Sequence, residues 1–312
     1  MLRHDGVAVN VLTRAGERTV KLRRGVDAPT VGDWLALDGE QLLAVLDRAS
    51  LLRRRAAGSD DQQLLAANLD VVLIVCGLDR PVRAGRVQRG EALAWDAGAH
   101  PVLVLTKADL ATDVDALVAQ VDEEHPALER LVTSSHTGQG IDELRRRLDG
   151  VTSVLLGESG AGKSRLVNAV LEEEAAVVGA VRSSDAKGRH TTTNRQMHLL
   201  PSGGVIIDSP GIREVGLVGD EESVEATFTD VEELALACRF NDCAHQGEPG
   251  CAVQAAVDDG TLSQDRLDDY QELLAEAMSA ARRADEHARR TYEKRFTKAV
   301  REHQQDNPRN RP

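Results

Sequence analysis

Aromatic side chains are scarce in this sequence: two Trp, two Tyr and three Phe make up 2% of its 312 residues. Proteins that hold extended single-stranded nucleic acid stack successive bases on aromatic rings. The composition therefore argues against an extended base-stacking platform.

Long apolar runs are also missing. No run approaches the ~18 residues that a membrane-spanning helix needs, and the start MLRHDGVAVN has neither the apolar segment of a signal peptide nor a lipidation pattern. We therefore expect a cytoplasmic protein that does not bind membranes. With 41% hydrophobic residues, the chain can bury one sizeable core and carry one or two small accessory modules.

Cysteines are few, and three of the four are clustered. The spacing C-x4-C-x-H-x5-C predicts a closed tetrahedral zinc site with a structural role, and an iron–sulfur cluster or a redox pair is the alternative. The fourth cysteine, Cys76, lies in the apolar run VVLIVCG and is expected to be a buried core residue. The predicted zinc ligands are Cys238, Cys243, His245 and Cys251.

Basic side chains are fewer than acidic ones, 38 against 51, which gives a net charge of −13. This balance argues against nonspecific coating of nucleic acid by the whole molecule. Basic segments nevertheless occur at 21–25, 53–55 and 289–301. They are either solvated faces or local RNA-binding surfaces.

The pattern of apolar residues divides the chain into about three domains of a multidomain α/β protein. Residues 1–58 show short alternating stretches separated by glycine and charge, which predicts a small β-barrel of about five strands. Residues 59–218 contain near-continuous apolar runs, each followed by a segment of helical length, which predicts a parallel sheet covered by helices. Strands MHLLP and GVIID should complete that sheet. Residues 219–312 are expected to be helical, with amphipathic helices over 262–302.

The segment GESGAGKS at 157–164 predicts a phosphate-binding loop, because it follows an apolar strand and precedes a helical run. Lys163 should reach the β and γ phosphates and Ser164 should ligate Mg²⁺. The segment DSPG places Asp208 to hold Mg²⁺ through water and the amide of Gly211 to meet the γ-phosphate. The residues predicted to contact the nucleotide at the phosphate loop are Gly157, Glu158, Ser159, Gly160, Ala161, Gly162, Lys163, Ser164 and Arg165.

The segment TKAD at 106–109 predicts specificity for guanine. The carboxylate of Asp109 can accept hydrogen bonds from the ring N–H and the exocyclic amine of guanine, which adenine cannot offer. Lys107 should lie along the base plane. Thr106 stands where Asn is usual and should weaken a hydrogen bond between loops. In SSHTGQG, Ser134 and Ser135 should present a backbone amide to the guanine carbonyl oxygen. The alternative to a guanine-specific protein is an ATPase in which TKAD occurs by chance.

Between the phosphate loop and DSPG lies SSDAKGRHTTTNR, which is polar and lacks apolar periodicity, as expected for a mobile switch loop. Thr191 or Thr192, with preference for Thr192, should complete the Mg²⁺ shell. The residue after DSPG is Ile212, which cannot orient water. His190 is therefore the candidate for orienting the attacking water, against the alternative of a loop histidine with no role.

The motifs occur in the order TKAD, SSHTGQG, GESGAGKS, GRHTTT and DSPG. Ordinary G proteins begin with the phosphate loop and carry the base-reading motif late. The sequence thus predicts a circularly permuted GTPase, in which DSPG runs directly into the cysteine-bearing C-terminal segment.

This set of motifs, with GRHTTT, DSPGI, VGDW at 31–34 and HQGEPGCAV at 245–253, resembles the RsgA (YjeQ) family of GTPases dependent on the small ribosomal subunit. The resemblance covers nearly the whole chain. It implies an N-terminal OB-fold, a C-terminal zinc domain, hydrolysis of GTP to GDP, and binding to the small subunit and its rRNA near the decoding region. It also implies a role in late subunit maturation that includes release of assembly factors.

We expect a monomer in which the basic segments place rRNA against the barrel and the C-terminal helices, and in which the acidic GTPase module lies outside or against ribosomal protein. The alternative is a nucleotide-regulated RNA-binding chaperone, in which GTP clamps the protein on RNA with little productive hydrolysis.

Overall fold

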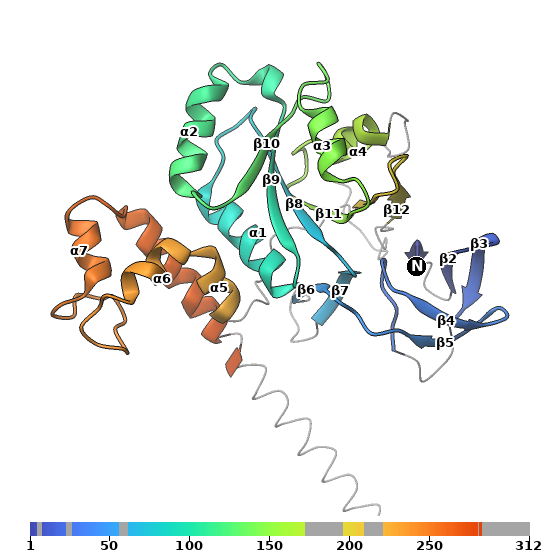
Figure 1. The fold of residues 1–312 in the computed structure, drawn as a ribbon, viewed down its shortest axis with the longest axis horizontal. Helices are drawn as coiled ribbons and strands as arrows, with labels where there is room; N and C mark the ends of the chain where they lie inside the picture. The colour runs from blue at the N-terminus through green and yellow to red at the C-terminus, as the bar shows by residue number, and fades with distance from the viewer. Residues whose placement is uncertain are drawn as a thin grey trace, which may run out of the picture.

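The structure is a computed structural model that describes residues 1–4, 8–22, 27–55, 62–171, 196–208, 221–279 and 281–282. Figure 1 shows a small β-sheet unit, a central sheet flanked by helices, and a group of helices on the opposite side of the central sheet from the β unit.

The N-terminal unit contains the five strands expected from the sequence. Its sheet order is β1-β2-β3-β5-β4, and β3 pairs with β5 in parallel. Alternate apolar residues of β2 and single residues of β3 and β5 point inward and form a small core of Val9, Val11, Val20 and Leu42. The strands are β1 (Arg3–His4), β2 (Ala8–Thr13), β3 (Gly16–Lys21), β4 (Leu35–Asp38) and β5 (Gln41–Val45).

A separate antiparallel pair, β6 (Leu51–Arg55) and β7 (Gln62–Ala67), follows this unit. Leu52 and Leu65 are buried in the core of the central domain. The two strands flank residue 58, where we placed the end of the first domain, and that boundary remains a prediction. The pair packs against the core of the central sheet, and Ala67 also donates a backbone hydrogen bond to Val31 of the N-terminal segment.

The central sheet has the order β10-β9-β8-β11-β13-β12 and is parallel except for β12, which pairs antiparallel with β13. The short connection between these two strands allows only an antiparallel pairing. The predicted parallel sheet and its two completing strands are thus confirmed. Its strands are β8 (Val71–Gly77), β9 (His100–Thr106), β10 (Glu129–Val132), β11 (Thr152–Leu156), β12 (Gln196–Leu199) and β13 (Val205–Asp208).

Helices cover both faces of this sheet. All seven residues of β8 are buried, and successive residues point to opposite faces. Val72, Ile74 and Cys76 pack with α1 (Ala84–Asp96) and α2 (Val114–Glu124). Val71, Leu73 and Val75 pack with α3 (Ile141–Arg147) and α4 (Lys163–Leu171). Cys76 is 6% exposed, which confirms that it is a core residue.

The C-terminal part is helical, as expected. It comprises α5 (Glu221–Thr227), α6 (Thr229–Ala235), α7 (Ala252–Asp258) and a helix over 264–279. These helices share a core that includes Phe228 and Leu267, and Ala92 of α1 packs into the same core. The C-terminal helices therefore dock directly on α1. Residues beyond 282, where the predicted helices continue, lie outside the described residues.

Arg266 fixes the arrangement of these helices. Its guanidinium group donates hydrogen bonds to both carboxylate oxygens of Asp230, at 3.0 and 2.8 Å, and to the carbonyl oxygen of Thr227 at 3.0 Å. It also lies 4.2 Å from the ring centroid of Phe228, within the range of a cation–π interaction.

Among the described residues, no helix has the length and apolar character needed to cross a membrane.

Candidate functional site

The predicted nucleotide-binding motifs meet at one edge of the central sheet. TKAD follows β9, SSHTGQG follows β10, and GESGAGKS follows β11. Asp208 is the last residue of β13. Ligands of open α/β sheets bind outside the carboxyl ends of the parallel strands, which is where these loops converge.

The phosphate loop depends on glycine. Gly157, Gly160 and Gly162 have φ values of +150°, +83° and +98°, which L side chains rarely adopt. A β-carbon on Gly157 would also collide with the carbonyl oxygen of Val75. The loop leads directly into α4, so the positive end of a helix faces the phosphate-binding position.

Lys163 is buried inside the loop, at 8% exposure. Its ammonium group donates hydrogen bonds to the carbonyl oxygens of Gly157 at 2.5 Å and Glu158 at 2.6 Å. Burial raises the pKa of Asp208, while the positive charges of Lys163 and His198 oppose that rise. A buried carboxylate beside the phosphate-loop lysine is suited to holding Mg²⁺ next to a triphosphate.

Thr106 connects the base-reading loop to the phosphate loop. Its hydroxyl group donates to the carbonyl oxygen of Ala161 at 2.5 Å. On Gly162, a β-carbon would lie 3.2 Å from the same hydroxyl oxygen. The loop-to-loop hydrogen bond therefore persists with Thr in place of Asn, and its reduced strength stays a prediction.

Asp109 and Ser134, both predicted to read the base, are hydrogen-bonded to each other. The Ser134 hydroxyl donates to Asp109 Oδ1 at 2.5 Å and accepts the amides of His136 at 3.2 Å and Thr137 at 3.1 Å. The hydrogen bond from Ser134 lowers the pKa of Asp109, helped by the nearby charges of His136 and Arg165. Asp109 is thus held as an ionised acceptor, as recognition of the guanine N–H groups requires.

Lys107 has a left-handed conformation, with φ of +60°, and its Nζ donates to Asp79 Oδ2 at 2.8 Å. Neither Asp79 nor its neighbour Arg80 belongs to one of the predicted nucleotide-binding motifs. The available signal was their position, because LDR directly follows the buried strand β8 and so reaches the same sheet edge as the other loops.

The four predicted zinc ligands come together away from this edge, with their ligand atoms all within 4.8 Å of one another. Cys238 Sγ lies 4.0 Å from Cys251 Sγ, and His245 Nδ1 lies 3.7 and 3.5 Å from these two sulfurs. Around a tetrahedral zinc ion, with Zn–S of about 2.3 Å and Zn–N of about 2.0 Å, the ligand atoms are separated by about 3.5 to 3.8 Å. The three thiolates and one imidazole therefore fit zinc.

Backbone groups hold this cluster in place. The amides of Ala252 and Gln254 donate to the sulfurs of Cys238 and Cys251, each at 3.3 Å. Gln271, on the helix over 264–279, donates to the carbonyl oxygen of His245 at 3.1 Å. Such contacts to a ligand and its backbone orient the site for the metal.

Four predicted site residues cannot be compared with this geometry. His190, Thr191, Thr192 and Gly211 lie outside the described residues. Their roles remain predictions.

The predicted base-reading motifs come first in the chain, the phosphate loop follows them, and the zinc cluster comes last. This order defines a circularly permuted P-loop GTPase with a zinc-binding C-terminal domain. The family described as RsgA GTPase matches residues 45–218, and relatives cover most of the chain. The chain belongs to the RsgA GTPase family.

Two relatives and two solved structures illustrate the similarity. A Vibrio parahaemolyticus protein named small ribosomal subunit biogenesis GTPase RsgA 2 is 44% identical over 92% of this chain and 82% of its own length. A Streptomyces avermitilis protein named small ribosomal subunit biogenesis GTPase RsgA is 47% identical over 81% and 71%. YjeQ from Thermotoga maritima superposes with a TM-score of 0.67, 27% identity and coverage of 89% and 96%. YloQ, described as a circularly permuted GTPase, shares the fold with a TM-score of 0.63 at 24% identity over 89% and 94%.

Proposed function

We propose that this protein binds the small ribosomal subunit and hydrolyses GTP to GDP and phosphate during late subunit maturation, releasing assembly factors. The observation that carries the proposal is the hydrogen bond from Ser134 to Asp109, in a loop that Thr106 bonds to the phosphate loop. A base-specific acceptor is thereby fixed relative to the phosphate site. The names of the relatives support the ribosomal role.

In this proposal the chain's own residues divide the work of phosphoryl transfer. Lys163 leaves the loop carbonyl oxygens and binds the β and γ phosphates, while Ser164, Thr192 and Asp208 hold Mg²⁺. Mg²⁺ bound there would supply positive charge to the phosphate oxygens. His190 orients the attacking water, and the amide of Gly211 binds the γ-phosphate.

We further propose that the protein acts as a monomer in the cytoplasm.

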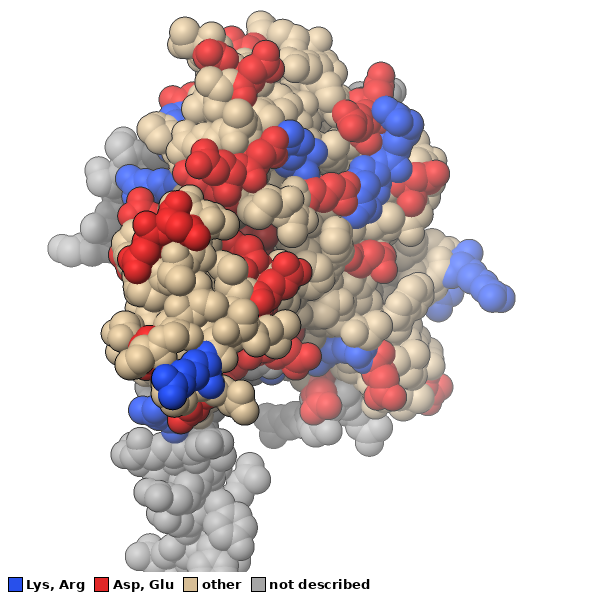
Figure 2. All heavy atoms as spheres, turned by 60° about the vertical axis from the view of Figure 1, so that its left-hand side comes forward, with Lys and Arg blue, Asp and Glu red and all other residues tan. Residues whose placement is uncertain are grey.

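Figure 2 shows acidic side chains spread over the face that carries the C-terminal helices, with Lys and Arg in small separate groups. Such a face repels phosphate backbones. We therefore assign rRNA contact to the β unit and the basic segments. Of the latter, 289–301 and most of 21–25 lie outside the described residues, and Arg53 pairs with Asp96 at 3.4 Å.

Replacing His190 with Ala distinguishes a GTPase from a nucleotide-clamped RNA chaperone. We expect His190→Ala to keep GTP affinity and to lose about 100-fold or more of the single-turnover rate measured on small subunits, because a positioned acid–base group contributes about that much. The variant should also stay bound to the subunit with GTP. Hydrolysis at the normal stimulated rate would remove the catalytic role of His190 and point to a ribosomal group acting in trans.

A further inference from the structure

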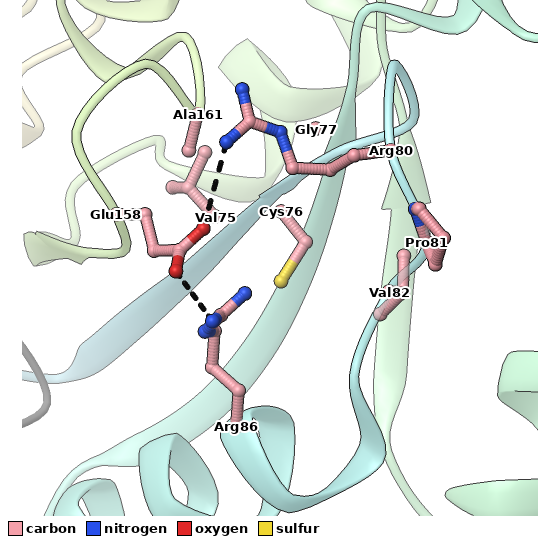
Figure 3. Close-up of a pocket in the computed structure, with 9 residues that line it drawn as sticks. All are labelled: Val75, Cys76, Gly77, Arg80, Pro81, Val82, Arg86, Glu158 and Ala161. Carbon is pink, nitrogen blue, oxygen red and sulfur yellow. Dashed lines mark ion pairs between the residues drawn. The ribbon is translucent and has the colours of Figure 1, made fainter.

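Glu158, the second residue of the phosphate loop, is held between two arginines (Figure 3). Arg86 on α1 pairs with its Oε1, and Arg80 lies on the other side with Nη1 3.8 Å from Oε2. The Arg86 side chain is 15% exposed and the Glu158 side chain 38%, so solvent screens the pair on the carboxylate side. The three residues and Cys76 line a cavity of about 10 Å³, roughly the room of one water molecule.

The phosphate-loop pattern does not require a carboxylate at this position. A negative charge in the loop opposes binding of a triphosphate unless neighbouring cations compensate for it. Arg86 and Arg80 supply that compensation. The negative charge of Glu158 by itself lowers the affinity for the nucleotide, and the two arginines offset this effect.

The same end of α1 also contacts the C-terminal helices. One turn beyond Arg86, the Arg89 guanidinium donates to Glu272 Oε1 at 2.7 Å and Glu276 Oε1 at 3.4 Å, both on the helix over 264–279. A β-carbon placed on Gly85, next to Arg86, would lie 3.6 Å from Asp269 Oδ1 of that helix. Farther along α1, Ala92 is buried in the C-terminal core. A single short stretch of α1 thus touches both the phosphate loop and the zinc-binding domain.

We propose that Glu158 is a positioning residue that ties the phosphate loop to α1 through Arg86, so that docking of the zinc-binding domain on α1 and retention of the nucleotide are coupled. The inference rests on the proposed function, because the nucleotide is taken to be GTP or GDP. Coupling of this kind is reciprocal: whatever moves the zinc-binding domain on α1 changes nucleotide affinity, and nucleotide binding changes how firmly that domain is docked. The link runs through contacts independent of the chain connection at DSPG.

A double-mutant cycle on the full-length, zinc-loaded protein tests this coupling, with dissociation of fluorescent GDP as the readout. We expect Glu158→Gln and Arg89→Ala each to speed dissociation by about 5- to 10-fold, the lower range of allosteric coupling. Removal of the negative charge of Glu158 would by itself slow dissociation, so faster release from Glu158→Gln reports the broken link to α1. The double variant should be no faster than Glu158→Gln alone, because Arg89 acts on the nucleotide through Glu158. A simple loss of local structure at two independent sites would instead give the product of the two effects.

Arg147→Ala is the matched control. Arg147 pairs with Glu129 at 2.7 Å. Glu129 is the first residue of β10, so the pair lies at the amino ends of the parallel strands, whereas the phosphate loop follows the carboxyl end of β11. This variant should release GDP at the wild-type rate. If Glu158→Gln does not fold, Arg86→Gln interrupts the same link and takes its place.

Two failures are distinguishable. Wild-type protein that does not bind guanine nucleotide overturns the proposed function. Wild-type protein that binds GDP normally, with unchanged dissociation in the variants or with multiplicative effects in the double variant, overturns the coupling while leaving the proposed function intact.

Discussion

Replacing Asp109 with Asn should lower the affinity of this protein for GTP by about 10⁴-fold. A site built to hydrogen-bond one group of its ligand discriminates by about this factor when that hydrogen bond cannot form. The carboxylate is held ionised by the 2.5 Å hydrogen bond from Ser134. An amide presents a donor where guanine also presents a donor. Xanthine carries an oxygen at that position, so affinity for xanthosine triphosphate should rise in the same variant.

Equilibrium binding of fluorescent GTP and xanthosine triphosphate measures both changes. Asp113→Asn is the matched control, because Asp113 lies in the same loop but caps α2 by accepting the amide of Ala116 at 3.0 Å. The control should bind GTP like wild type. Unchanged GTP affinity in Asp109→Asn would remove Asp109 from the site.

Replacing Cys251 with Ser should eliminate the bound zinc, from one ion per chain to none, and unfold the segment around 238–251. Structural zinc contributes about 10 to 16 kcal/mol of apparent binding free energy in small domains. The segment contributes little to the C-terminal core besides the ligand cysteines themselves, since Leu236 and Phe240 beside the ligands are 88% and 43% exposed. The helices around Phe228 keep their own core, so the loss of structure should stay local.

Metal analysis and hydrogen exchange of 238–251 measure this effect, and GTP binding at the phosphate loop should survive it. Cys76→Ala is the control, because Cys76 is buried in the central sheet and should leave the zinc content unchanged. Protein purified without chelator that contains almost no metal would refute the zinc site outright.

The sequence predicted those features that depend on local pattern. The apolar run of β8 is buried at all seven positions, and the glycines of 157–164 adopt the positive φ values that the phosphate loop requires. Close spacing along the chain likewise predicted the zinc ligands. In each case the residues that act together are neighbours in sequence or occupy equivalent ends of neighbouring strands.

Local sequence patterns could not predict the contacts between elements that are far apart in the chain. The pairing of Glu158 with Arg86, or of Lys107 with Asp79, depends on how loops of different strands meet at the sheet edge. The packing of β6 and β7 against the central core is similar, because alternation alone does not say which core a strand joins. Thr106 shows the same limit: its short side chain still reaches Ala161, which depends on the distance between two loops.

The most direct test of the proposed function is steady-state GTP turnover by the wild-type protein with purified small or large ribosomal subunits. We predict slow turnover of the free protein, a rise of about 100-fold with small subunits, as expected when docking positions an acid–base group, and no rise with large subunits. Turnover that is unchanged by small subunits, or that rises equally with both, would contradict the proposed function.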